Sequence, residues 1–354
     1  AILNMKQNFL TYGAYGYTGT LIAELAVKNG LKPILAGRDY EKTKKLADRL
    51  GLEWLSFDIS DTITLENALK NVKAILHCAG PFALTTSTVL EVCLKTQTHY
   101  LDITGEIEVF EYVAHQDKKA KQAGITLLPG VGFDVVPSDC LAGFLKNQLP
   151  DATSLELAFM GSGGVSRGTA LTMARNLHKG GAIRENGKIK SVPSAYEVKT
   201  IDYGVKKALS VCIPWGDVST AYYSTQIPNI KVFMAQPKKL ITWMKRSNYL
   251  SWLLGLGFVQ KIIQNSINKK VVGPNETQRE ASKSFLWGKV TNSHGKSVEA
   301  RLLTPEGYKL TAATALMATQ KLLSGNLPSG FLTPSMAFGA DFILEVEGVE
   351  RTLV

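Results

Sequence analysis

The stretch Thr-Tyr-Gly-Ala-Tyr-Gly-Tyr-Thr-Gly, residues 11–19, decides the fold of this chain. It follows a short apolar run and opens an apolar-periodic segment that predicts a helix. A strand, a glycine-rich turn and a helix in this order are typical of a dinucleotide-binding site, in which backbone amides approach a pyrophosphate at the helix N-terminus. The loop residues that we expect at the cofactor are Gly13, Tyr15, Gly16, Tyr17, Thr18 and Gly19.

Arg38 indicates which dinucleotide binds. It follows the second apolar run, Lys32–Ala36, at the place where an NAD site usually carries an acidic residue, about 20 residues beyond the glycine loop. A guanidinium there can form a forked hydrogen-bonded pair with a 2′-phosphate, so we predict NADP. The adjacent Asp39 leaves NAD as the alternative, although Asp39 is equally suited to cap the helix expected from Tyr40 to Leu50.

The first 150 residues alternate between short apolar runs and helical patterns, which is typical of βαβ units and a parallel sheet. The expected strands are Asn8–Tyr12, Lys32–Ala36, Glu53–Phe57, Ala74–Cys78, His99–Ile103 and Ile125–Leu128. Helices are expected between them, including Glu41–Leu50, Thr86–Thr96 and Glu106–Ala123.

Ligands of parallel sheets bind at the carboxyl ends of the strands. Asp58 follows the third expected strand, so we expect it near the adenine, with capping of a helix as the alternative. Ala79, Gly80 and Pro81 follow the fourth strand and are expected to border the cofactor.

Beyond residue 138 the pattern changes to runs of strands with few helices, which favours a second, α+β domain. Strands are expected at 152–161, Lys188–Val192, Glu197–Tyr203, Ala208–Pro214, Ile230–Ala235, Ser284–Asn292, Ser297–Leu303 and Phe342–Val346. Helices are expected at Arg167–Asn176, 239–271 and Glu306–Leu323.

The fold class that follows is α/β with two domains. Residues 1–138 form a Rossmann-type, doubly wound parallel sheet that binds the dinucleotide. Residues 139–304 form an α+β domain for substrate or dimerisation, with a mixed or antiparallel sheet. Residues 305–354 form a C-terminal segment that returns to the Rossmann domain.

The charge and the cysteine spacing indicate which classes of partner to expect. The chain has 354 residues and a formal net charge of +10. The basic excess lies in residues 151–300, yet no RNP aromatics, zinc knuckle or recognition-helix pattern accompanies it, so we expect no nucleic acid. The spacing of Cys78, Cys93, Cys140 and Cys212 predicts no metal site. With no signal-peptide pattern, we expect a cytoplasmic protein with reduced thiols, with a position at the membrane periphery as the alternative. We also expect a homo-oligomer.

Tyr249–Ile263 is the most apolar stretch, and its flanks are basic. It is shorter than the roughly 20 residues that span a bilayer. We expect it to be buried or to line an apolar pocket; the alternative is an amphipathic helix in peripheral contact with a membrane surface.

Several segments together resemble the saccharopine dehydrogenase-like oxidoreductases of the NADP-binding type, nearest the branch that contains the trans-acting enoyl reductases of lipid assembly. The segments that carry the resemblance are 13–19, 36–38, Ala-Gly-Pro-Phe at 79–82, Tyr-Leu-Asp-Ile-Thr-Gly-Glu at 100–106, Pro-Gly-Val-Gly-Phe-Asp-Val-Val-Pro-Ser-Asp at 129–139, 166–169, 304–308 and Gly-Phe-Leu-Thr-Pro-Ser-Met-Ala-Phe-Gly-Ala-Asp at 330–341. The resemblance implies a Rossmann domain, completed by a C-terminal helix, and an inserted domain that carries the substrate.

The expected activity is NADPH-dependent reduction of a C=C or C=N bond in a small-molecule or lipid-linked substrate. A saccharopine-type imine reductase, with Arg167, Arg175 or Arg184 binding carboxylates, is the enzymatic alternative. A non-catalytic NADP-binding sensor or membrane-associated scaffold is the alternative from another class.

Hydride transfer needs a proton donor beside the nicotinamide. The candidate catalytic residues are Tyr100, Asp102, Asp134, Asp139 and Arg167. Burial can raise the pKa of a carboxyl and make it an acid at neutral pH. Four of these five candidates also have a structural explanation: Asp139 can cap a helix, Tyr100 and Asp102 can belong to the core, and Arg167 can be an ordinary surface arginine. The functional role expected of Arg167 is that of an anion anchor.

Overall fold

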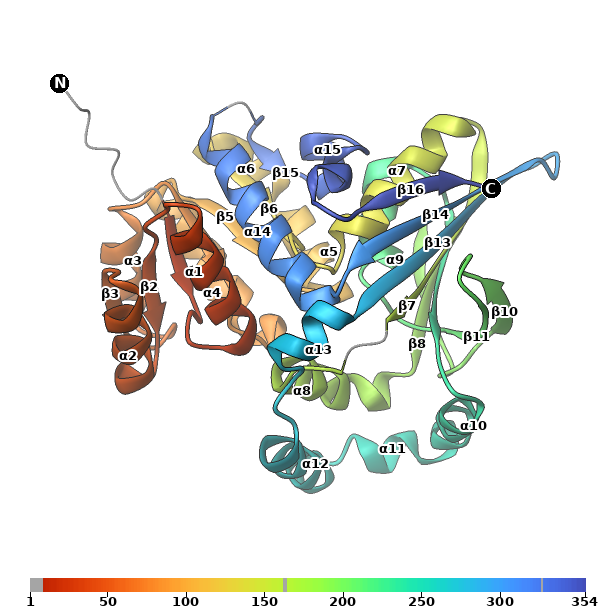
Figure 1. Cartoon of the computed structure of the whole chain (residues 1–354), viewed down its shortest axis with the longest axis horizontal. Coiled ribbons are helices and arrows are strands. Elements are labelled where there is room, and N and C mark those ends of the chain that lie inside the picture. The colour runs from red at the N-terminus through yellow and green to blue at the C-terminus, as the bar shows by residue number, and fades with distance from the viewer. Residues whose placement is uncertain (1–8, 162–163, 326) are drawn as a thin grey trace. The chain divides into compact units, whose positions relative to one another are not determined.

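The computed structural model describes residues 9–161, 164–325 and 327–354 (Figure 1). The chain divides into two compact units. The first contains the residues up to Val136 together with Tyr308–Ala337, and the second contains Pro137–Gly307 together with Phe338–Val354.

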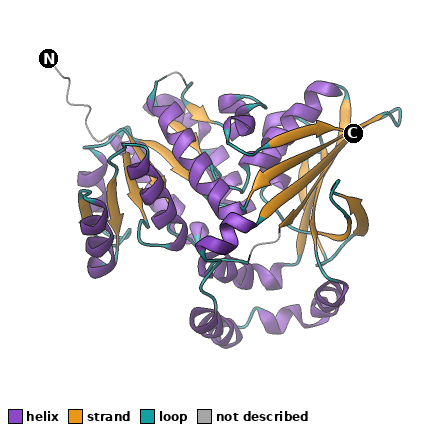
Figure 2. Ribbon diagram, viewed as in Figure 1, coloured by secondary structure: helices purple, strands orange, loops and turns teal. Residues whose placement is uncertain are grey.

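The first unit is built on a seven-stranded sheet in the order β15-β6-β5-β4-β1-β2-β3, with every neighbouring pair parallel. Strands are orange and helices purple in Figure 2. The strands are β1 (Phe9–Tyr12), β2 (Ile34–Gly37), β3 (Trp54–Ser56), β4 (Ala74–His77), β5 (His99–Asp102), β6 (Thr126–Leu128) and β15 (Gly330–Phe331). The order reverses between β1 and β4, where doubly wound sheets bind ligands. The expected Rossmann-type sheet is confirmed.

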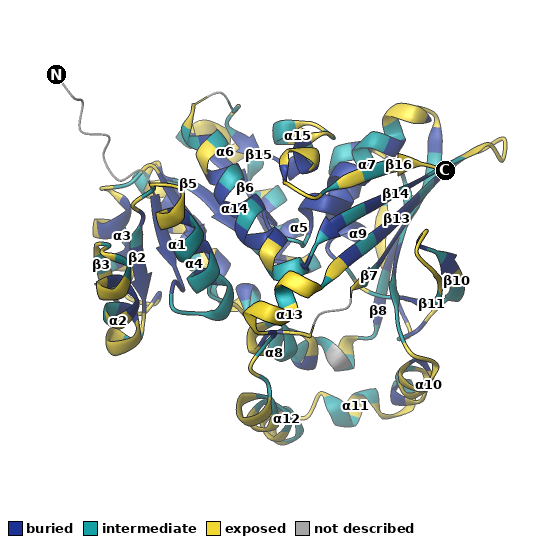
Figure 3. Cartoon of the chain, viewed as in Figure 1, coloured by how far each residue is buried: buried dark blue, intermediate teal, exposed yellow. Residues whose placement is uncertain are grey.

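Helices separate these strands along the chain. They are α1 (Tyr17–Lys28), α2 (Tyr40–Leu50), α3 (Thr62–Leu69), α4 (Phe82–Thr96), α5 (Ile107–His115), α6 (Asp117–Ala123) and α14 (Gly307–Leu323). Every residue of β1 and β4 is buried (Figure 3), as expected for central strands of a parallel sheet that helices cover on both faces. The single helix expected over Glu106–Ala123 is instead two helices that meet at Gln116.

The second unit contains a nine-stranded mixed sheet with the main order β10-β11-β12-β7-β13-β14-β16, while β8 pairs with β12 and β9. Its strands are β7 (Ala152–Gly161), β8 (Gly181–Glu185), β9 (Lys188–Val192), β10 (Val198–Asp202), β11 (Lys207–Cys212), β12 (Asn229–Ala235), β13 (Lys283–Asn292), β14 (Ser297–Pro305) and β16 (Glu350–Leu353). Among the described strands of this sheet, β7 and β12 are the one pair of parallel neighbours. The expected α+β domain with a mixed sheet is confirmed.

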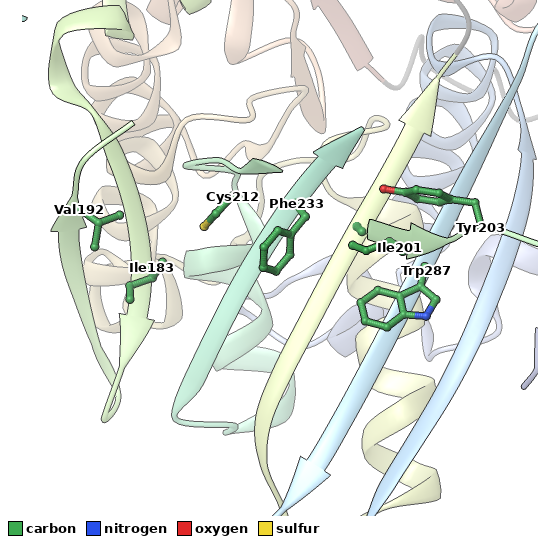
Figure 4. Close-up of a cluster of buried hydrophobic side chains, with 8 residues drawn as sticks. Ile183, Val192, Ile201, Tyr203, Cys212, Phe233 and Trp287 are labelled. Carbon is green, nitrogen blue, oxygen red and sulfur yellow. The ribbon is translucent and has the colours of Figure 1, made fainter. Parts of the chain in front are cut away.

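Two features hold this sheet together. The helix α7 (Val136–Gln148) packs so closely that a Cβ atom at Gly288 would lie 2.6 Å from Leu145 Cδ1. A cluster of buried side chains, including Phe233 of β12, Ile201 of β10 and Trp287 of β13, joins these strands (Figure 4).

The C-terminal residues differ from the expectation. Residues 338–354 belong to the second unit, because β16 pairs with β14 and the Arg351 guanidinium lies 3.8 Å from the centre of the Phe144 ring. The strand expected at Phe342–Val346 is wrong: Phe342–Glu345 is a short 3-10 helix. Its buried Phe342 and Ile343 produced the apolar pattern.

The segment expected as one helix over 239–271 is broken. It contains α10 (Lys238–Ser247), the 3-10 turn η2 (Asn248–Leu250), α11 (Ser251–Leu254) and α12 (Gly257–Lys270). The expectation that Tyr249–Ile263 is buried is wrong, because neither α11 nor α12 contains a buried residue. None of the described helices is both long enough and apolar enough to cross a bilayer.

Candidate functional site

The glycine loop has the geometry of a close turn between β1 and α1. Gly13 has a φ of +80°, and a Cβ atom there would lie 2.8 Å from the Ala79 backbone nitrogen. A Cβ atom at Gly19 would overlap the Gly13 carbonyl oxygen. Glycine is therefore required at both positions, by backbone conformation at the first and by close helix packing at the second.

Gly16 differs from these two glycines, because the space beside its Cα is almost empty. It precedes the first residue of α1 with a φ of −65°, and the only atom within 4 Å of a Cβ placed there is the Gly13 carbonyl oxygen, at 3.1 Å. No side chain caps α1 and no acidic residue lies in its first turn, which contains Tyr17 and Thr18. The helix N-terminus thus presents backbone amides and a positive dipole to an anion, as a pyrophosphate site requires.

Tyr15 and Asp39 shape the end of β2. The Tyr15 ring fills the space beside Gly37, where an added Cβ atom would lie 2.5 Å from Tyr15 Cε1. Asp39 caps α2 by accepting a hydrogen bond of 3.0 Å from the Lys42 backbone nitrogen, and its second oxygen pairs with Lys42 Nζ at 2.9 Å. Because both carboxylate oxygens of Asp39 have partners, the capping interpretation fits better than binding of a ribose.

Arg38 is exposed, and it forms no ion pair within the part of the chain that the structure describes. Its positive charge contributes to lowering the pKa of Asp58, after the larger effect of hydrogen bonds from Ser60. Arg38 and Asp58 therefore lie close together at the carboxyl ends of β2 and β3. An unpaired guanidinium at this edge suits a 2′-phosphate.

We expect the substitution Arg38→Ala to weaken NADPH binding by about 10- to 100-fold and NADH binding much less, since a hydrogen bond to a charged group contributes about 1.5–3 kcal/mol. Titration calorimetry with both dinucleotides measures the difference. Arg49→Ala is the matched control, because Arg49 is also an exposed arginine but pairs with Glu24. Equal losses for NADPH and NADH would show that Arg38 does not contact the 2′-phosphate.

Asp58, Ala79, Gly80 and Pro81 lie in turns at the carboxyl edge of the sheet. Asp58 Oδ1 accepts hydrogen bonds from the Ser60 backbone nitrogen and hydroxyl, at 2.9 and 2.7 Å. The Ala79 carbonyl accepts a hydrogen bond of 3.2 Å from the Thr85 hydroxyl. These contacts order the turns after β3 and β4, and the contact of either turn with a cofactor remains a prediction.

Glu106 was not singled out from the sequence, although it ends one of the resembling segments. Its buried carboxylate accepts hydrogen bonds from the Phe82 and Ala83 backbone nitrogens, at 2.8 and 3.4 Å. It thereby caps α4 from a distant loop and orients the turn that contains Gly80. Sequence alone could not indicate this cap, because its two partners are 24 and 23 residues away.

We expect Glu106→Ala to lower the free energy of unfolding by about 1.5–3 kcal/mol, because buried hydrogen bonds to a charged group are lost. Urea denaturation followed by circular dichroism measures the change. Glu106→Gln keeps one acceptor oxygen and should lose less, while the exposed Glu41→Gln should lose almost nothing. Wild-type stability in Glu106→Ala would contradict the capping role.

Tyr100 and Asp102 are both fully buried at the end of β5. The Tyr100 hydroxyl donates to Asp102 Oδ2 at 2.6 Å, and Asp102 Oδ1 accepts from the Thr104 and Gly130 backbone nitrogens at 3.0 and 2.9 Å. Burial raises the pKa of Asp102 to about 6 and that of Tyr100 well above its usual range. This pair joins the turns that follow β5 and β6, which suits a positioning role.

Asp134 lies in the turn after β6 and is partly exposed. Its carboxyl occupies the space that a side chain at Gly105 would need, since a Cβ atom there would overlap Asp134 Oδ2. Among the described residues, none donates a hydrogen bond to this carboxyl. Burial raises the pKa of Asp134 to about 8, so the carboxyl holds a proton at neutral pH.

The turn that contains Asp134 is held by α14. The Thr311 hydroxyl oxygen accepts a hydrogen bond of 2.9 Å from the Phe133 backbone nitrogen, and the Thr314 hydroxyl donates to the Val131 carbonyl at 2.8 Å. Both threonines are more than 170 residues away along the chain. The C-terminal helix therefore fixes the position of the candidate acid.

The other two candidates lie in the second unit. Asp139, in the first turn of α7, is fully buried and accepts a hydrogen bond of 2.7 Å from the Ser224 hydroxyl. Arg167 begins α8 (Arg167–Asn176), is exposed, and donates through Nε to the Val271 carbonyl at 3.1 Å. The glycine-rich loop before α8 includes residues 162 and 163, which lie outside the described residues.

The parallel order of the first sheet and the open helix N-terminus at its reversal point define a dinucleotide-binding domain of the Rossmann class. Residues 9–128 match the family model of the saccharopine dehydrogenase NADP-binding domain. The first unit is similar to this family, and the match indicates NADP as its cofactor. That Arg38 contacts the 2′-phosphate remains a prediction.

Curated relatives agree with this assignment. The chain is 28% identical over 162 residues to a saccharopine dehydrogenase-like oxidoreductase of Mus musculus, over 40% of this chain and 38% of that protein. It is 30% identical over 140 residues to a trans-acting enoyl reductase of Mycobacterium tuberculosis, over 37% of this chain and 34% of that protein. These matches span less than two fifths of either relative.

Two other similarities extend along almost the whole chain. A lipid droplet localized protein of Caenorhabditis elegans is 22% identical, over 94% of each chain. The apo structure of a saccharopine dehydrogenase from Saccharomyces cerevisiae has a TM-score of 0.69, covers 98% of this chain and 99% of its own, and is 14% identical in sequence. The latter similarity shows that the two proteins share a fold.

Proposed function

We propose that this protein is an NADPH-dependent reductase of a C=C or C=N bond and that Asp134 donates the proton. The observation that carries this proposal is the environment of Asp134: a partly exposed residue at the carboxyl edge of a nucleotide-binding sheet, with a carboxyl whose pKa burial raises to about 8. Of the three carboxyl candidates, Asp102 and Asp139 are fully buried and accept hydrogen bonds from neighbouring groups. A proton donor has to reach the substrate, which favours Asp134.

Reduction of the double bond needs a hydride at one atom, which a nicotinamide dinucleotide held by the glycine loop would supply. The protein has to supply a proton to the other atom. In this proposal the Asp134 O–H bond breaks, the proton goes to the substrate, and Asp134 becomes a carboxylate. Since the side chain is partly exposed, a proton from water restores it before the next turnover.

The substrate class rests on the relatives. The name of the mycobacterial relative indicates reduction of an enoyl group, and the name of the nematode relative indicates a lipid environment. An α,β-unsaturated acyl substrate, in small-molecule or lipid-linked form, is therefore our first choice.

Saccharopine-type imine reduction requires arginines that are available to bind substrate carboxylates. Two of the expected arginines already donate hydrogen bonds to backbone carbonyls, which makes this alternative less well supported. Arg184 is buried and donates to the Val218 and Gly187 carbonyls, both at 2.8 Å. Arg167 donates to the Val271 carbonyl. Both side chains thus form hydrogen bonds with backbone carbonyls of the second unit.

A direct test follows NADPH oxidation with two substrate sets: 2-enoyl thioesters of increasing chain length, and an imine formed in solution from glutamate and an aldehyde. We expect turnover with the enoyl set. Turnover with the imine alone would favour the saccharopine-type alternative. Tight NADPH binding with no oxidation in either set would favour the non-catalytic sensor or scaffold.

A further inference from the structure

Most residues of the segment from α10 to α12 are exposed or half-buried (Figure 3). Several of them are large apolar residues, which a folded domain normally buries. The exposed fraction is 84% for Tyr249, 70% for Trp252, 64% for Phe258 and 65% for Ile262. Leu240, Trp243, Leu250 and Leu256 are exposed as well. Clusters of this kind mark a surface that contacts a partner.

The helices of this segment also pack against the rest of the second unit. Ile241 is buried and joins Met244 in a cluster on β11. The Gln260 amide donates to the Ala174 carbonyl of α8 at 3.1 Å. Phe258 and Ile262 are four residues apart, so they share one face of α12, and both are exposed. Helices α10 and α12 therefore pack against β11 and α8 through some residues and expose large apolar side chains at others.

The same segment has an unusual charge. No Asp or Glu occurs between Asp217 and Glu276. Within this interval, seven exposed basic residues surround the apolar side chains: Lys238, Lys239, Lys245, Arg246, Lys261, Lys269 and Lys270. None of the seven forms an ion pair within the described part of the chain. We call this combination of exposed apolar and basic residues over 238–270 the basic-aromatic surface.

We propose that the basic-aromatic surface docks on an anionic lipid surface, with Trp252 and Phe258 inserted at the headgroup level and the lysines on the phosphate groups. Amphipathic helices that lie in a membrane interface combine apolar side chains with lysine and arginine in this way, and tryptophan and tyrosine favour the interface itself. This inference does not depend on the proposed reductase activity.

A second copy of the chain fits the surface less well. In a two-fold dimer the same patch meets itself. Seven cations would then face seven cations, with no carboxylate of the segment to neutralise them. Anionic headgroups remove this repulsion, since each lysine or arginine near an anionic leaflet contributes attraction that salt screens.

Flotation of the full-length protein with vesicles tests the proposal. Vesicles of phosphatidylcholine alone are compared with vesicles of phosphatidylcholine and phosphatidylserine in equal parts. We expect flotation with the anionic vesicles, less at high salt, and little with the neutral ones. Failure to float with anionic vesicles would overturn the proposal.

Two paired variants identify the surface. Trp252→Glu/Phe258→Glu and Lys269→Glu/Lys270→Glu should each weaken binding to anionic vesicles by at least about 10-fold. The matched controls are Ile63→Glu, which changes a side chain that is 75% exposed in the first unit, and Lys28→Glu/Lys32→Glu. Circular dichroism and NADPH affinity should be those of the wild type in all four.

Two results would contradict the assignment. The first is unchanged flotation of both surface variants. The second is a wild-type dimer that Trp252→Glu/Phe258→Glu converts to a monomer in sedimentation velocity without any lipid binding; it would assign the surface to self-association.

Discussion

Replacing Gly16 by aspartate is expected to abolish NADPH binding and to leave the protein folded. The backbone at Gly16 has a φ of −65°, which any residue adopts, and a Cβ atom there would meet only the Gly13 carbonyl oxygen. The carboxylate would instead occupy the space in front of the α1 amides and repel the pyrophosphate. The loss of two hydrogen bonds to a charged group corresponds to about 100-fold or more in affinity.

Titration calorimetry and a thermal melt separate the two effects. Gly16→Ala adds the Cβ atom without charge, so it should fold normally and retain more affinity than Gly16→Asp. Gly13→Ala is a contrasting variant, because its φ of +80° and the contact with Ala79 predict a loss of stability. Wild-type NADPH affinity in Gly16→Asp would mean that the loop does not hold the pyrophosphate.

Replacing Asp134 by asparagine is expected to lower kcat by about 10²–10⁴-fold, the usual contribution of a general acid, without changing NADPH affinity. The wild-type rate should fall as pH rises through about 8, because the carboxyl then loses the proton that it has to donate. The residual rate of the variant should lack this pH dependence. Stopped-flow measurement of NADPH oxidation, with the substrate found in the enoyl or imine set, gives both results.

Gly105→Ala provides an independent variant, because the added Cβ atom displaces the Asp134 carboxyl without removing it. We expect it to lower kcat as well, with unchanged affinity for NADPH. If Asp134→Asn keeps the wild-type rate and pH profile, the proton comes from another group and the assignment of the acid fails.

Local sequence patterns determined the first sheet, its glycine loop and the cofactor. The alternation of apolar runs with helical segments predicts a parallel sheet without knowledge of distant contacts. Asp39 could be assigned as a helix cap from its place after β2, and it caps α2 over the expected Tyr40–Leu50. The contact of Arg38 with the 2′-phosphate remains a prediction from the same pattern. Each of these features depends on residues close in sequence.

Tertiary structure alone decided the roles of the buried polar groups. Glu106 caps a helix that begins 24 residues earlier, and Thr311 holds a turn 178 residues away. The pKa of Asp134 depends on how deeply the surrounding turns enclose its carboxyl. Composition at these positions does not reveal burial or partners.

The stretch Tyr249–Ile263 also shows that burial cannot be read from composition, here because apolar residues are exposed. Its apolar composition predicted burial, yet the structure exposes Tyr249, Trp252 and Phe258. Hydrophobicity is a property of the residues, whereas burial depends on which other elements arrive to cover them. The sequence by itself determined that this segment is apolar with basic flanks, and the tertiary structure decided that no described element of its own unit buries these side chains.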